Sequence, residues 1–214
     1  RNKITSGLYI ANPRDGMAEV IKESARLLFS NQIYNDALIY IRLALMLKPN
    51  DEEAISLLAN YQEVHENWQE AINLYDKINK DSDLYENSQV NKAGALYRSG
   101  DKKGAKKMLL AITETTKDKY IPLVTLADLL RRDNEFKEAV EIYTKVLDYI
   151  DKKNSSSWAI FFARGISFER SGEWKKAEAD FLDALELYPN QPEVMNYLAY
   201  SWIEHNQNLK KATE

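Results

Sequence analysis

The sequence predicts an all-α fold, a solenoid of antiparallel helix pairs, and two periodic series of small residues carry this prediction. The first series recurs at intervals of 34, 34, 34, 38 and 34 residues: Ala25, Ala59, Ala93, Ala127, Gly165 and Ala199. The second follows the first by twelve or thirteen residues: Ala37, Ala71, Ala105, Ala139, Ala177 and Ala212. Small residues let two helix backbones approach closely. Two series in step therefore predict two helices per repeat, crossing at these residues.

Larger apolar residues keep the same register in the second helix of each repeat. Four residues after the small residue, and so on the same helix face, stand Ile41, Tyr75, Leu109, Tyr143 and Phe181. Three residues before it stand Tyr34, Trp68, Phe136 and Trp174, which we expect to fill the turn between the two helices. Lys102 and Leu209 occupy this position in the other two repeats.

Helix-breaking residues fall at the predicted boundaries. Pro49-Asn50-Asp51 and the stretch 189–192 close one repeat and open the next, while Gly100 and Gly172 mark turns within repeats. The serines of 155–157 supply an N-cap where the interval lengthens to 38, which predicts a longer loop. The predicted organisation is an extension at 1–15 and a single solenoid at 16–214, with repeats at about 18–51, 52–85, 86–119, 120–157 and 158–191 and a partial one at 192–214.

Composition excludes several classes of function. The formal net charge of −4 argues against nucleic-acid binding and against a broad contact with anionic membranes. The chain has no cysteine and no apolar stretch long enough to span a bilayer. We find no catalytic motif, metal-ligand spacing or cofactor-binding loop, and His65 and His205 fit solvated positions at the ends of first helices. The sequence therefore predicts a protein that is not an enzyme, with no cofactor and no bound metal.

The repeat resembles the tetratricopeptide repeat (TPR), with its 34-residue period and W-x2-L-G-x2-Y, A-x3-F, P signature. The resemblance covers about residues 16–214, although Ser24, Lys92 and Arg164 stand where the signature has a buried Leu. It implies a right-handed superhelix whose first helices line a concave groove, and a role in binding proteins or extended peptides. The best match is the fifth repeat: Phe161, Arg164, Gly165, Phe168, Gly172, Trp174, Ala177, Phe181, Ala184 and Pro189.

Residues 158–205 further resemble a group of long bacterial TPR proteins, many of which carry export signals. This likeness implies a bacterial source and a periplasmic site, with a cytoplasmic one left open. It also implies that the chain is an internal portion of a longer protein.

Spacing from the first series indicates which residues face the groove. Interleaved Arg, Asn and aromatic side chains there suit an extended peptide. The arrangement does not match the clamp with which some TPR domains hold a carboxylate tail, because Arg26, Leu57 and Asn91 replace the required Asn and basic residues. The candidate groove residues are Lys22, Arg26, Asn60, Asn91, Tyr97, Arg98, Asp128, Arg131, Phe162 and Tyr200.

An alternative to peptide binding is a structural role. In that case the chain is a module that forms a homo-oligomer through its uncapped last repeat.

Overall fold

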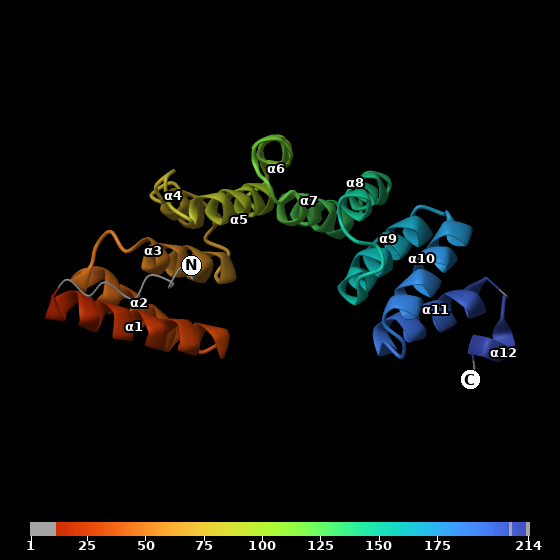
Figure 1. Ribbon diagram of the computed structural model, residues 1–214, viewed down its shortest axis with the longest axis horizontal. Helices are drawn as coiled ribbons and strands as arrows, with labels where there is room; N and C mark the ends of the chain where they lie inside the picture. The colour runs from red at the N-terminus through yellow and green to blue at the C-terminus, as the bar shows by residue number, and fades with distance from the viewer. Residues whose placement is uncertain (1–11, 206, 213–214) are drawn as a thin grey trace, which may run out of the picture. The chain divides into compact units, whose positions relative to one another are not determined.

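The computed structural model describes residues 12–205 and 207–212, and every regular element in this part of the chain is helical (Figure 1). The all-α prediction is confirmed. The chain divides into two compact units, residues 1–105 and 106–214, and the boundary falls within α6. The helices are α1 (Pro13–Ser30), α2 (Tyr34–Leu47), α3 (Glu52–Val64), α4 (Trp68–Tyr75), α5 (Tyr85–Arg98), α6 (Lys102–Thr115), α7 (Tyr120–Arg132), α8 (Phe136–Tyr149), the 3-10 turn η1 (Ser155–Ser157), α9 (Trp158–Arg170), α10 (Trp174–Leu187), α11 (Pro192–Glu204) and α12 (Leu209–Ala212).

Helix pairs stack in sequence order within the first unit. Helix α1 packs on α2 and α3 on α4, while α2 and α4 each contact the first helix of the next pair. Ala25, Ala37, Ala59 and Ala71 are fully buried where these helices meet, as their periodicity predicted. Helix α1 begins at Pro13, inside the stretch expected to be an extension, because Asn12 caps it by accepting a hydrogen bond from the Asp15 amide.

The second unit repeats this arrangement. Helix α7 packs on α8, α9 on α10 and α11 on α12, and α8 and α10 each contact the following first helix. Gly165 and Ala177 are buried at the α9–α10 crossing. In the longer loop, the cap comes from Asn154, whose Oδ1 accepts from the Ser156 amide, and not from the serines themselves. The predicted single solenoid through both units stays a prediction.

The turn inside each helix pair is closed by one residue in the left-handed backbone region. Glycine tolerates this conformation without penalty, and Asn tolerates it better than most other residues. The sequence pointed to the two glycines, but the structure places Gln and Glu in the same conformation. The residues with positive φ keep the repeat intervals: Gln32, Glu66, Gly100, Asn134 and Gly172.

The aromatic residues that begin the second helices also link one repeat to the next. Each contacts a basic or imidazole side chain at the end of the following first helix, in addition to the turn that it was expected to fill. His65 and His205 are exposed, as expected, and are also ring partners in this series. The contacts are Tyr34 with His65, Trp68 with Arg98, Phe136 with Arg170, and Trp174 with His205.

Two positions where the TPR signature has leucine hold cations with a partner. Arg164 donates from Nε and Nη2 to both oxygens of Asp180, at 2.8 and 2.7 Å, and Asp180 is buried. Lys92 pairs with Asp76 at 2.5 Å. Paired and hydrogen-bonded charges are tolerated in such places where an isolated charge would not be. Within the described residues, none of the helices combines the length and hydropathy needed to cross a lipid bilayer.

Candidate peptide-binding surfaces

Four polar residues of α3 and α5 come together around one buried hydroxyl in the first unit. We call Asn60, Glu63, Asn91 and Arg98 the α3–α5 surface. Tyr75, fully buried on α4, donates its hydroxyl to Glu63 Oε1 at 2.7 Å. The Tyr75 hydroxyl oxygen also lies 2.8 Å from Asn60 Oδ1, a second acceptor for the same proton. Arg98 Nη1 donates to Glu63 Oε2 at 3.1 Å, and its guanidinium lies 5.4 Å from the centre of the Trp68 ring.

The pKa values of this group reflect its partial burial. Burial raises the pKa of Glu63, while the Tyr75 hydrogen bond and the positive charge of Arg98 oppose that rise. Burial and the neighbouring Glu63 carboxylate raise the pKa of Tyr75, and a hydrogen bond from Asn91 opposes this shift. The hydroxyl therefore stays protonated and available as a donor at neutral pH. The Tyr75 hydroxyl on the second helix, α4, thus fixes the polar side chains of this surface by hydrogen bonding.

The same arrangement recurs on α7 in the second unit. The Tyr143 hydroxyl, buried on α8, donates to Asp128 Oδ1 at 2.5 Å and accepts from Arg131 Nε at 3.1 Å. Asp128 and Arg131 both keep part of their side chains exposed. Burial opposes the charged form of Arg131, yet its bonds to Tyr143 and Asp128 leave its pKa raised.

Aromatic rings gather on α9, on α11 and at Tyr188, which directly follows the last residue of α10. We call Trp158, Phe162, Tyr188 and Tyr197 the α9–α11 aromatic surface. The Phe162 ring meets Tyr197 edge to face at 5.8 Å and Trp158 in a stacked arrangement at 6.2 Å, and Trp158 stacks on Tyr188 at 6.1 Å. Tyr197 donates its hydroxyl to Glu169 at 3.1 Å, and burial together with Glu169 raises its pKa to about 12.

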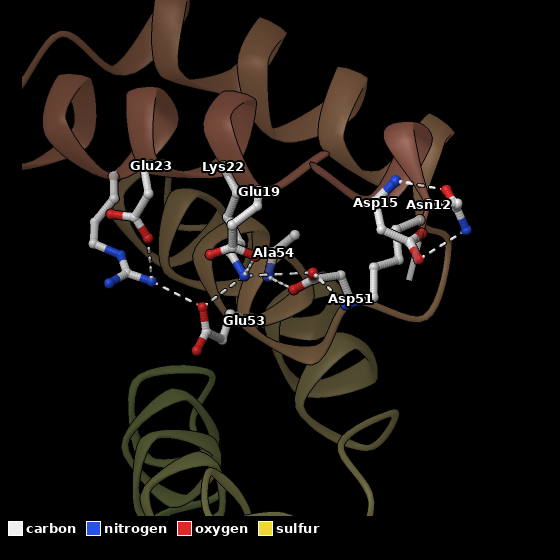
Figure 2. Close-up of polar contacts among 10 residues, drawn as sticks. Asn12, Asp15, Glu19, Lys22, Glu23, Asp51, Glu53 and Ala54 are labelled. Carbon is white, nitrogen blue, oxygen red and sulfur yellow. Dashed lines mark hydrogen bonds and ion pairs between the residues drawn. The ribbon is translucent and has the colours of Figure 1, made fainter. Parts of the chain in front are cut away.

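Lys22 does not lie on an exposed face, contrary to its expected place in the groove. It is 4% exposed, and Figure 2 shows it pointing between Glu19, Glu53 and Asp51. Its Nζ lies 2.8 Å from Glu19, 2.8 Å from Glu53 and 3.4 Å from Asp51. Burial disfavours the charged amine, but these carboxylates outweigh it and raise the pKa of Lys22. Lys22 therefore joins α1 to the start of α3.

The remaining predicted residues differ in exposure. Arg26 is exposed and pairs with Glu53 at 2.9 Å. Tyr97 is buried at 6% exposure with the Lys102 ammonium 5.7 Å from its ring centre, so it contributes to packing. Tyr200 is 68% exposed on α11.

Three carboxylates near Lys22 lie close enough together to be considered as ligands of a metal ion. In the described part of the chain, oxygens of Glu19, Glu23 and Glu53 lie within 4.8 Å of one another. Lys22 and Arg26 already pair with all three, so their positive charges take the role that a cation would have. The cluster supports no metal site.

Sequence reasoning missed the hydroxyls of Tyr75 and Tyr143, which were interpreted as packing residues. Their rings do pack, but their oxygens position the polar groups of the first helix. The available signal was the residue type, because Tyr stands at these two positions where other repeats have Ile41, Leu109 and Phe181. A buried Tyr hydroxyl usually finds a hydrogen-bond partner.

The fold and these surfaces define a class of protein: an α-helical repeat protein that presents ordered polar and aromatic side chains on its first helices. A family model for the tetratricopeptide repeat matches residues 124–192 and 162–212. Residues 124–212 therefore contain tetratricopeptide repeats, and the helix pairs before them share the fold of such repeats. A search of curated proteins found no significant match.

Solved structures with the same fold include several TPR proteins. PilF of Pseudomonas aeruginosa is 15% identical, with a TM-score of 0.66, over 94% of this chain and 90% of that one. The C-terminal part of a TPR protein from Cytophaga hutchinsonii is 16% identical, with a TM-score of 0.66, over 89% and 74%. YrrB, described as a TPR protein with an unusual peptide-binding site, is 17% identical, with a TM-score of 0.54, over 86% and 97%. The predicted class, a solenoid of helix pairs, is confirmed.

Proposed function

We propose that this chain is a non-catalytic scaffold that binds an extended peptide or protein segment along its first helices. The TPR fold supports a protein-interaction scaffold in general, and TPR proteins are generally not enzymes. The observation that carries the finer proposal is the Tyr75 hydroxyl, which fixes Asn60 and Glu63 of α3 next to Asn91 and Arg98 of α5. The bacterial source implied by the sequence agrees with the named organisms of two structural relatives.

Preorganised side chains lose little conformational freedom when they bind a ligand, which favours affinity. Asn side chains can donate to and accept from a peptide backbone at once, and Arg98 offers several donors beside the flat face of Trp68. The α9–α11 aromatic surface supplies rigid apolar area of the kind that anchors a large side chain. Each surface, taken within its own unit, suits a peptide segment: the first unit offers polar contacts and the second offers aromatic ones.

A peptide selected from a random display library tests this proposal. Its dissociation constant is measured by calorimetry for the wild type and for Arg98→Glu and Arg131→Glu. We expect each reversal to weaken binding at least about tenfold, close to 1.4 kcal/mol. The control is Lys145→Glu, an exposed reversal on the second helix α8. If both arginine variants bind the peptide as tightly as Lys145→Glu does, the first helices are not part of the binding site.

A second candidate is self-association through the last repeat, supported by apolar exposure on α11. Met195 is 47% exposed and Ile203 is 50% exposed. The double variant Met195→Glu, Ile203→Glu tests it by light scattering. Dissociation of an oligomer in this variant supports the assembly role, and an unchanged mass counts against it.

A further inference from the structure

The rings of the α9–α11 aromatic surface keep part of their area open to solvent. Tyr188 is 48% exposed, and Trp158, Phe162 and Tyr197 are half-buried. The Trp158 ring lies nearly parallel to those of Phe162 and Tyr188, at interplanar angles of 30° and 25°. Aromatic faces carry negative electrostatic potential and attract cations. This surface can therefore bind a positively charged group as well as an apolar one.

Other aromatic rings of this protein are already covered by its own basic side chains. In the described part of the chain, no Lys or Arg lies over a ring of the α9–α11 aromatic surface. The covered rings are Trp68 by Arg98, Tyr97 by Lys102, Phe136 by Arg170, Phe161 by Arg164, and Phe168 by Arg164 and Lys176.

A carboxylate is held against this aromatic surface. Glu169 Oε2 accepts the Tyr197 hydroxyl at 3.1 Å. Burial makes the largest contribution to the raised pKa of Tyr197, the charges of Glu169 and Glu204 raise it further, and Arg170 opposes them. The two carboxylates together outweigh the single arginine, so the potential at the Tyr197 hydroxyl favours a positive charge.

The equivalent position in the first unit has a cation that the second unit lacks. Glu63 of α3 pairs with Arg98 of α5 at 3.1 Å. The residues at the same repeat positions on α9 and α11 are Glu169 and Glu204, each 106 positions further along the chain. The ion pair between α3 and α5 is therefore replaced by two carboxylates on α9 and α11.

A second pair of equivalent positions shows the same loss of a cation. Glu53 of α3 pairs with Lys22 of α1 at 2.8 Å. The residues 140 positions further along are Glu193 of α11 and Phe162 of α9, so a ring stands where the first unit has an ammonium group. Within residues 12–205 and 207–212, neither Glu169, Glu193 nor Glu204 forms an ion pair.

The arginines of α9 are engaged elsewhere. Arg164 donates to both oxygens of Asp180 on α10. The Arg170 guanidinium lies 5.8 Å from the ring centre of Phe136 on α8. Neither arginine makes a direct contact with the carboxylates of Glu169 and Glu204, so a cation from a ligand can fill this role.

We propose that the α9–α11 aromatic surface binds a lysine or arginine side chain of a partner peptide, whose cation takes the place that Arg98 has beside Glu63. The inference rests on the proposed peptide-binding function and names the residue type that the second unit selects. The aliphatic stem of such a side chain packs on the rings, while its charged end reaches the Glu169 and Glu204 carboxylates.

Peptides selected from a random display library are the probes, with each of their basic residues replaced by Gln in turn. We expect at least one replacement to raise the dissociation constant for the wild type about tenfold, measured by calorimetry. The same replacement should have little effect on binding to Glu169→Gln, Glu204→Gln, because that variant has lost the charges that the cation meets. Glu169→Gln keeps an oxygen that can accept the Tyr197 hydroxyl.

The matched control is Glu70→Gln, Glu141→Gln, which removes two exposed carboxylates from the second helices α4 and α8. It changes the net charge by the same amount, so a general attraction between basic peptides and an acidic protein would affect both double variants alike. We expect the control to discriminate between the original and the Gln-substituted peptide as the wild type does. Circular dichroism confirms that each variant keeps its helices.

The contribution of the rings is tested separately. Tyr188→Leu keeps apolar bulk but removes an aromatic face, and it should weaken binding of the basic peptide about threefold. Tyr40→Leu, at a residue 38% exposed on α2, is the control and should bind as the wild type does. Equal binding by both leucine variants would contradict a contact between the cation and this surface.

The outcomes separate this inference from the function on which it rests. If no peptide is selected, the proposed function fails and this inference fails with it. If Arg98→Glu or Arg131→Glu weakens peptide binding but replacement of basic residues by Gln changes nothing, only this inference is wrong. It is also wrong if the Gln replacement has the same effect on Glu169→Gln, Glu204→Gln as on the control variant.

Discussion

Gly165 of α9 lies directly against the ring of Phe181 on α10. A Cβ built on Gly165 would come within 2.6 Å of Phe181 Cε1 and 2.8 Å of Phe181 Cδ1. Phe181 is fully buried and also contacts the rings of Phe162 and Trp174. The small residue of this repeat is therefore required by the ring that crosses it.

Gly165→Ala should destabilise the second unit, because the added methyl must displace the Phe181 ring or separate α9 from α10. We expect a loss of about 1–3 kcal/mol in the free energy of unfolding, measured by urea denaturation. Gly94→Ala on α5 is the control, since its added Cβ meets nothing within 4 Å. There, alanine should stabilise by about 0.5–1 kcal/mol through its helix propensity. Equal effects at both positions would contradict the close-packing argument.

Lys22→Met should cost about 1–3 kcal/mol, because the buried Asp51 carboxylate loses one of its two cationic partners and keeps only Lys48. Lys152→Met is the matched control. Lys152 pairs with Asp148 in an exposed contact of about 1 kcal/mol or less. Chemical denaturation of the two variants measures the difference. If Lys22→Met unfolds at the wild-type urea concentration, the three ion pairs contribute little to stability.

Acidification should lower the free energy of unfolding, because the ionised Asp51 carboxylate contributes to it. Burial alone would raise the pKa of Asp51, but the Ala54 amide and the charges of Lys22 and Lys48 outweigh it and lower that pKa below its usual value of about 4. A carboxyl group with a lowered pKa stabilises the fold above its unfolded pKa, and this contribution is lost as the pH falls through the folded pKa.

Asp51→Asn isolates this charge, because Asn is as good an N-cap as Asp. The wild type should melt at a higher temperature than the variant at pH 7, and the gap should narrow below about pH 4. Thermal melts followed by circular dichroism measure both values. A gap that does not change with pH would mean that the Asp51 charge is not the source of the stabilisation.

Tyr75→Phe should lower the free energy of unfolding by about 1 kcal/mol through the lost hydrogen bond. It should also raise the pKa of Glu63 further, because the Tyr75 hydroxyl is one of the two groups that hold this pKa down. Carboxyl-carbon NMR titration follows Glu63 directly. Tyr200→Phe is the control at an exposed tyrosine and should change stability by less than about 0.5 kcal/mol. An unchanged Glu63 titration would contradict the assigned role of the hydroxyl.

For most of the candidate site, the sequence predicted which helix a residue belongs to but not which side chains it contacts. Spacing from Ala59 and Ala127 placed Asn60, Asp128 and Arg131 correctly on first helices. Spacing could not show that Lys22 reaches across to Asp51, 29 positions away, or that Tyr97 is buried. Such contacts depend on side-chain length and on residues of another helix, which a period within one helix does not encode.

The sequence by itself determined that this protein is a series of helix pairs and where each pair turns, because close backbone approach demands a small residue once per helix. Only the tertiary structure decided which polar side chains of the first helices are held by a buried hydroxyl and which form ion pairs. It also decided which apolar residues of the first repeat are exposed. The physical reason is that burial and hydrogen bonding are properties of neighbours brought together by folding, whereas periodicity is a property of one segment alone.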